Sequence, residues 1–186
     1  MTPESAHRAG GHLGRRAGVR RGSIHGVSSL AGPDQPVPPG WRTHQHVQRF
    51  VTPAPRARVW AWLVDPATFT DTQIPPWRVE FLGGGFDEGV LTTHHGPGLH
   101  LPGVIAEVRD GEYRDLQYLY GAWAVSFRLL RPTRLQIAVA DAPGGTEVEV
   151  RIDAHVHPRM LRIWALSQRL FWRRFGTWTA RATAAA

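Results

Sequence analysis

The segment PRMLRIWALSQRLFWRRFGTWTARA, residues 158–182, carries the pattern that decides the fold. Large apolar residues recur in it at intervals of three, four and seven, which gathers them on one side of an α-helix: Leu161, Trp164, Phe171, Phe175 and Trp178. Three arginines fall on the opposite side: Arg162, Arg169 and Arg173. Pro158 suits the first turn, where its missing N–H leaves no hydrogen bond unmade. The segment therefore predicts a long amphipathic helix that needs a broad apolar surface to pack on.

The middle of the chain supplies a sheet that offers such a surface. Segments with period-two alternation or short apolar runs predict strands at residues 46–52, 77–82, 89–95, 103–109, 112–120 and 122–130. Clusters of glycine and aspartate separate them, as turns require. Pro132 is expected to interrupt the last of these runs, which leaves the strand count open around residues 122–130.

Residues 134–156 form the clearest hairpin in the sequence. With the turn centred on Pro143–Gly144, three apolar pairs face each other on one side: Val139 and Val148, Ile137 and Val150, and Leu135 and Ile152. Polar residues occupy the other side, which is typical of a sheet with one face packed and one face solvated. The C-terminal helix is expected to dock on the apolar face.

Two short helices are predicted between the first and second strands. Pro55 opens the first of them, and Val59, Trp60 and Leu63 share one of its faces. Asp65–Pro66 ends this helix, because a residue before proline avoids helical geometry. A further helical turn is expected over residues 66–70.

Composition divides the chain into a tail and one folded domain. Residues 1–43 are rich in Gly, Ser, Pro and Arg and predict a disordered tail and linker, while residues 44–186 are long enough for one core. More than half of the formal net charge of +7 lies in that tail, so the folded part gives little reason to expect nucleic-acid binding. The chain has no cysteine and no apolar run of the roughly 20 residues that span a membrane.

The order of these elements, with three short motifs, resembles the helix-grip superfamily of START domains, birch-pollen-allergen-like (Bet v 1-like) proteins and polyketide cyclase/dehydrase-like (SRPBCC) proteins. The motifs are Ala54-Pro55 with Val59-Trp60, Asp65-Pro66, and Gly144-Gly145-Thr146. The resemblance covers about residues 45–182. It implies an α+β fold in which a curved antiparallel sheet of about seven strands grips the C-terminal helix. It also implies a cavity between sheet and helix suited to a hydrophobic small molecule or lipid.

Three functions remain open at this point, because one fold serves many activities. The first is a carrier or sensor of a hydrophobic molecule or lipid, which needs only the cavity. The second is a polyketide cyclase, aromatase or dehydratase, which also needs an acid/base pair inside it. The third is a protein-interaction domain without a usable cavity. A cytoplasmic location is expected for all three.

Aromatic residues of the predicted sheet and helices are the candidates for ligand binding, because aromatic walls with a few polar tips are typical of ligand pockets. They are Trp60, Tyr118, Tyr120, Trp123, Trp164, Phe171 and Phe175. The alternative for each of them is a plain role in the core.

The candidates for acid/base chemistry are His94, His95, Asp115 and Tyr118. A histidine facing the cavity could exchange protons near neutral pH, but adjacent strand residues face opposite sides, so only one of the two can enter. An inward Asp115 would need a partner, and an inward Arg114 could hold a ligand carboxylate or enolate. Exposed loop histidines are the simpler interpretation.

Four histidines on the first and last predicted strands raise the question of a metal site: His44, His46, His155 and His157. The resemblance implies that these two strands are antiparallel neighbours, so the four side chains could cluster. The spacing includes no cysteine or carboxylate in a recognisable ligand pattern, so a solvated surface is the preferred interpretation. We expect no metal and no cofactor. The arginines of the last helix could contact acidic lipid head groups, although a solvated helix face is the simpler explanation.

Overall fold

The computed structural model describes residues 35–70, 77–96, 99–119 and 129–184. The sheet strands among them are β1 (Arg42–Thr52), β2 (Arg78–Leu82), β3 (Leu91–Gly96), β4 (Leu99–Arg109), β5 (Tyr113–Tyr118), β6 (Leu130–Ala142) and β7 (Gly145–Val156). The helices are α1 (Arg56–Val64), α2 (Ala67–Thr70), the 3-10 turn η1 (Pro158–Met160) and α3 (Leu161–Ala184). Most of the predicted tail, residues 1–43, lies outside the described ranges.

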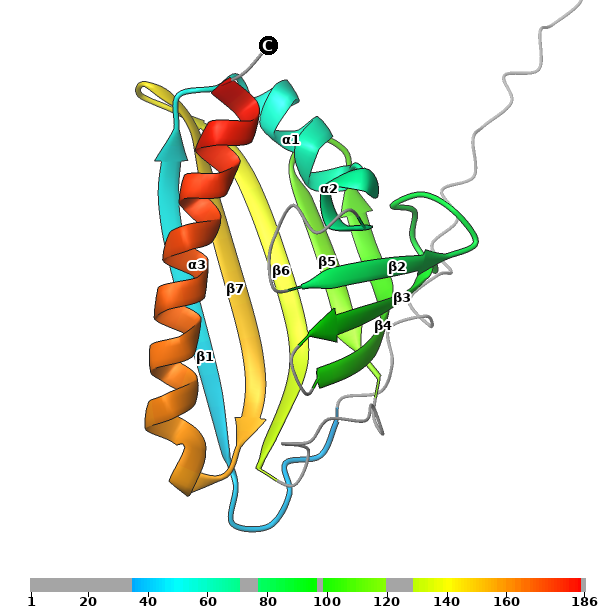
Figure 1. Ribbon diagram of the computed structural model, residues 1–186, viewed down its shortest axis with the longest axis vertical. Coiled ribbons are helices and arrows are strands. Elements are labelled where there is room, and N and C mark those ends of the chain that lie inside the picture. Colours follow the sequence, from blue (N-terminus) through cyan, green and yellow to red (C-terminus); the bar gives the residue numbers. More distant parts are fainter. Residues whose placement is uncertain (1–34, 71–76, 97–98, 120–128, 185–186) are drawn as a thin grey trace, which may run out of the picture.

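The seven strands form one antiparallel sheet in the order β1-β7-β6-β5-β4-β3-β2. Each strand pairs with its neighbour in sequence except β1, which pairs with β7. Figure 1 shows α3 running beside β1 and β7, with α1 and α2 at one end and β2, β3 and β4 curving across the sheet. This arrangement is the helix-grip fold, and it confirms the fold class predicted from the sequence.

The predicted hairpin register is confirmed. Three apolar pairs stand opposite each other in β6 and β7: Val139 and Val148, Ile137 and Val150, and Leu135 and Ile152. At the turn, Gly145 has φ +145°, and a Cβ there would lie 2.0 Å from the carbonyl oxygen of Thr52. A residue without a side chain is therefore required where the hairpin meets the end of β1.

Several predicted strand boundaries change, and so does the expectation for Pro132. β1 begins at Arg42 rather than residue 46, and β4 begins at Leu99 rather than residue 103. Pro132 does not interrupt a strand, because β6 runs through it with a register shift between Pro132 and Arg134. A bulge is the usual way in which a sheet accommodates a residue without an N–H. Most of the further strand expected at 122–130 falls on residues 120–128, outside the described ranges.

The apolar face of α3 is wider than the predicted stripe. Its buried residues follow steps of three and four along one line: Trp164, Gln168, Trp172, Phe175, Thr179 and Thr183. Trp172 is therefore a core residue, and its indole N–H donates to Gln168 at 2.9 Å. The buried line continues to the end of α3, where the hydroxyls of Thr183 and Thr52 of β1 lie 3.3 Å apart.

The helices give no sign of a membrane span. Among the described residues, no helix combines the length and the apolar character that crossing a bilayer requires.

A cavity between the sheet and the C-terminal helix

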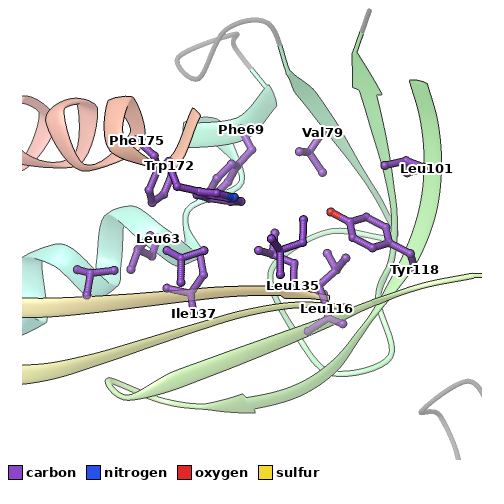
Figure 2. Packing of buried hydrophobic residues seen from close by; sticks show 14 of the residues in the cluster. Leu63, Phe69, Val79, Leu101, Leu116, Tyr118, Leu135, Ile137, Trp172 and Phe175 are labelled. Atoms are coloured by element: carbon purple, nitrogen blue, oxygen red, sulfur yellow. The ribbon is translucent and has the colours of Figure 1, made fainter. Parts of the chain in front are cut away.

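A cavity of about 400 Å³ lies between the inner face of the sheet and α3. Most of its wall is aliphatic or aromatic. Residues of every layer contribute: Phe69, Trp77, Val79, Phe81, Phe86, His94, Leu101, Arg114, Leu116, Tyr118, Leu130, Pro132, Leu135, Ile137, Ile152, Met160, Ile163, Trp164, Ser167, Gln168, Phe171, Trp172 and Phe175. Figure 2 shows several of these side chains converging from strands and helices, with the Tyr118 hydroxyl directed inward from its strand.

One charged side chain of the described sheet points into this space. β5 alternates so that Arg114, Leu116 and Tyr118 line the cavity. Arg114 is 6% exposed, and its guanidinium carbon lies 4.6 Å from the ring centre of Phe86 and 5.0 Å from that of Phe69. Burial lowers the pKa of Arg114 to about 9, so the group remains charged at neutral pH.

His94 and Tyr118 meet in the cavity wall, with Tyr118 four residues along β5 from Arg114. The hydroxyl of Tyr118 lies 3.5 Å from Nδ1 of His94, and the two rings are edge to face. Burial lowers the pKa of His94 to about 3, with a smaller contribution from the charge of Arg114. Burial also raises the pKa of Tyr118. At neutral pH the cavity therefore presents an uncharged imidazole and a protonated phenol.

Three buried nitrogens in the cavity wall lack a hydrogen-bond partner among the described residues. They are Nε2 of His94, whose protonation depends on the tautomer, Nε1 of Trp164 on α3, and Nε of Arg114 on β5. Buried polar atoms are nearly always satisfied in folded proteins, and a molecule in the cavity that carries polar atoms could satisfy these three.

Two of the predicted acid/base candidates lie on the outer face of the sheet instead. Asp115 is 1% exposed, but its carboxylate accepts from Arg134 at 2.5 and 2.9 Å. This carboxylate raises the pKa of Arg134. His95 lies with its Nε2 3.4 Å from Glu80. Alternation along a strand explains both results, because Asp115 follows the inward Arg114 and His95 follows the inward His94.

The ligand-binding candidates separate into three groups. Four of them line the cavity: Tyr118, Trp164, Phe171 and Phe175. Trp60 does not, because it is a buried residue of α1 whose indole N–H donates to Asp110 at 2.7 Å. Tyr120 and Trp123 lie outside the described residues.

Sequence reasoning did not single out several of the cavity's aromatic walls, namely Phe69, Trp77, Phe86 and Trp172. It named Arg114 without assigning it a face. The period of β5 carried the missing signal, since a strand that turns Tyr118 inward also turns Arg114 inward and Asp115 outward.

The four histidines considered for a metal site divide between the two faces of the sheet. His44 and His46 lie on the inner face of β1, where burial and the charge of Arg169 lower the pKa of His46. His155 alternates with the inward Ala154 and Val156 and lies on the outer face. Within the described part of the chain, no three His, Cys, Asp or Glu side chains gather as metal ligands would.

Comparison with known proteins gives structural matches only. No family model and no curated protein matches this sequence. Protein CV1439 from Chromobacterium violaceum superimposes with a TM-score of 0.58 at 15% identity, over 76% of this chain and 98% of that one. Ara h 8.0201 superimposes with a TM-score of 0.55 at 14% identity, over 74% and 98% of the two chains.

A third match is norcoclaurine synthase from Thalictrum flavum in complex with dopamine and hydroxybenzaldehyde, with a TM-score of 0.50 at 15% identity over 67% of this chain and 76% of that one. At such identities a structural likeness shows the fold and nothing further. The chain thus has the Bet v 1-like helix-grip fold that its sequence motifs predicted.

Proposed function

We propose that this protein binds a small, largely apolar organic molecule in the cavity between the sheet and α3, as a carrier or sensor. The observation that carries the proposal is the cavity itself. Its volume of about 400 Å³ falls in the range of small-molecule sites, and its walls are mostly apolar with a few polar groups that converge.

The molecules bound in one structurally similar protein support the same class of ligand. The norcoclaurine synthase structure holds dopamine and hydroxybenzaldehyde, which are both small aromatic molecules. In the present chain, aromatic residues from α2, β2, β5 and α3 surround the cavity and offer ring faces and edges to such a body. An aliphatic or lipid-like body of similar size fits the same apolar walls.

A pair of phenylalanine substitutions tests the proposal. Leu116 of β5 lines the cavity and is 3% exposed, whereas Leu166 of α3 is 55% exposed. Leu116→Phe should fill part of the cavity and weaken binding of the apolar probe 1-aminoanthracene about tenfold or more, while Leu166→Phe should leave it unchanged. Fluorescence titration of the folded variants measures both affinities. Equal binding by the two variants, or no binding to the wild type, would remove the basis of the proposal.

The facing pair of His94 and Tyr118 supports a second candidate, an enzyme that uses acid/base chemistry in this cavity. A neutral imidazole can accept a proton and a protonated phenol can donate one. Native mass spectrometry of freshly purified protein can identify a bound compound, which is then incubated with more protein. Unchanged compound supports a carrier or sensor, whereas conversion that His94→Gln abolishes supports the enzyme.

A tightly packed interaction domain, the third function considered from sequence, fits the structure least well. It requires that the space beneath Trp164 and Phe171 be filled, and both residues line the cavity instead.

A further inference from the structure

We infer that the ligand is a monocarboxylic acid with an apolar body, and that Arg114 binds its carboxylate inside the cavity. This inference rests on the proposed binding function and adds the chemical class of the ligand.

The first argument is that Arg114 is charged and buried and has no anionic partner among the described residues. It is 6% exposed, and no hydrogen bond or ion pair joins its guanidinium to any acceptor in the described part of the chain. A buried charge is unfavourable unless it is paired and hydrogen-bonded. The rings of Phe69 and Phe86 stabilise the cation partly, but ring faces do not satisfy its N–H groups.

The second argument is that this side chain lines the cavity. Arg114, Leu116 and Tyr118 contribute to the cavity wall from one face of β5, while Asp115, the nearest carboxylate in sequence, lies on the opposite face and is bound by Arg134. The acceptor that Arg114 lacks can therefore come from a molecule in the cavity.

The third argument concerns the charge of that molecule. Arg114 supplies one positive charge, and the two titratable groups of the cavity wall that its charge influences, His94 and Tyr118, are neutral at pH 7 because burial opposes their ionisation. A monoanion balances this charge, whereas a phosphate dianion would leave a buried negative charge uncompensated. The planar guanidinium also matches the two oxygens of a carboxylate.

The fourth argument is that other polar atoms of the cavity wall suit a bound acid. Among the described residues, Nε2 of His94 has no partner, and the Tyr118 hydroxyl has only the 3.5 Å contact with His94. Tyr118 lies four residues along β5 from Arg114, so this pair can hydrogen-bond a polar atom elsewhere on the molecule without adding charge. The rest of the wall is apolar and accommodates the hydrocarbon part of the molecule.

The test compares matched acids and amides, which have nearly the same shape but differ in charge. The probes are 2-naphthoate with 2-naphthamide and octanoate with octanamide, titrated into the full chain at pH 7 by isothermal titration calorimetry. Of the two acids, the one that the wild type binds more tightly should bind about tenfold or more tightly than its own amide.

Three variants assign this preference to Arg114. Arg114→Met should weaken binding of the acid about tenfold or more and change binding of the amide less than about threefold. Arg114→Lys keeps a charge without the planar fork and should give an intermediate affinity for the acid. Arg49→Met removes an exposed arginine on β1 and should change neither affinity, which controls for net charge.

The outcomes separate this inference from the proposed function. If the wild type binds an amide as tightly as its acid, the cavity function stands and the carboxylate assignment is wrong. An equal loss of acid and amide in Arg114→Met would also overturn it, because that result shows a structural role alone. If no probe binds the wild type, both proposals fail. If Arg114→Met does not fold, the acid and amide affinities of the wild type and of Arg114→Lys still test the carboxylate assignment.

Discussion

Arg114 and Arg134 lie on neighbouring strands of one sheet but on opposite faces, and their surroundings differ completely. Arg134 projects outward and is 41% exposed, yet it binds the buried carboxylate of Asp115 through two nitrogens. Arg114 projects inward and is buried, and its guanidinium lies over the rings of Phe69 and Phe86 with no ion-pair partner among the described residues. The outer arginine completes a structural ion pair, whereas the inner one carries a charge that the described fold does not neutralise.

One further pair of residues shows a similar contrast. The indole N–H of Trp60 on α1 donates to Asp110, while that of Trp164 beside the cavity has no partner within the described residues. Three of the nine buried side-chain atoms without a hydrogen-bond partner in these ranges belong to residues that line the cavity, namely His94, Arg114 and Trp164. A buried polar atom of this kind lowers stability unless something else satisfies it.

The largest expected effect comes from removing the two arginines in turn. Arg134→Met should lower the free energy of unfolding by about 3 kcal/mol, because it leaves the carboxylate of Asp115 buried without a counter-charge. Arg114→Met should leave that free energy unchanged or raise it by about 1 kcal/mol, because it removes an unpaired buried charge. Urea denaturation at pH 7, followed by circular dichroism, measures both.

Arg49→Met is the control for this prediction. It breaks an ion pair with Glu149 whose side chains are 63% and 35% exposed, so its effect should stay below about 1 kcal/mol. A larger loss of unfolding free energy for Arg114→Met than for Arg134→Met would contradict the proposed difference between the two faces of the sheet.

A smaller effect should appear in the pH dependence of stability. The folded-state pKa of His94 is about 3, below the ordinary value of 6.5, so between these values the unfolded chain binds a proton that the folded chain excludes. Stability should therefore fall as the pH drops through this window. The pKa values of His44, His46 and His155 are lowered as well and add to the fall.

His94→Gln should reduce the decrease in Tm between pH 7 and pH 5 by roughly 5 °C, because it removes one of these groups. His95→Gln, at the adjacent residue on the outer face, is the matched control. Differential scanning calorimetry at both pH values gives the result. Identical pH profiles for the wild type and His94→Gln would show that the inner histidine accepts a proton in the folded state.

The smallest expected effect is a difference in unfolding free energy between variants of Trp60 and Trp164. Trp60→Phe should lower the free energy of unfolding by about 1 kcal/mol, because it leaves Asp110 without its donor. Trp164→Phe removes a donor that has no partner in the described residues and should change that energy by less than about 0.5 kcal/mol beyond the loss of ring area. Thermal and urea denaturation of both variants measure these losses. A larger loss for Trp164→Phe than for Trp60→Phe, after correction for ring area, would contradict the prediction.

The fold was predictable because its signals are local and periodic. The hairpin register followed from the apolar pairs on either side of the turn at Pro143–Gly144, and α1 from Pro55 and the spacing of Val59, Trp60 and Leu63. Strand ends were less predictable. β1 extends back to Arg42 because β7 offers backbone partners there, and those partners are more than 100 residues away in the sequence.

The candidate site was predictable only in part, because it depends on which face each strand residue takes. Tyr118, Trp164, Phe171 and Phe175 line the cavity, but Asp115 and His95 do not. The alternation of β5 was readable from the sequence, yet the face could be fixed only relative to α3. Trp60 shows a different limit, since an aromatic residue on a short helix can equally serve the core.

The pairing of β1 with β7 has a consequence for synthesis of the chain. β1 emerges early from the ribosome, but its partner residues 146–156 follow about a hundred positions later, and α3 comes after them. Until then the inner face of the sheet lacks its cover, and β1 has no neighbour to bond. Such distant pairing slows folding, so the nascent protein must remain protected from aggregation until its final helix has been translated.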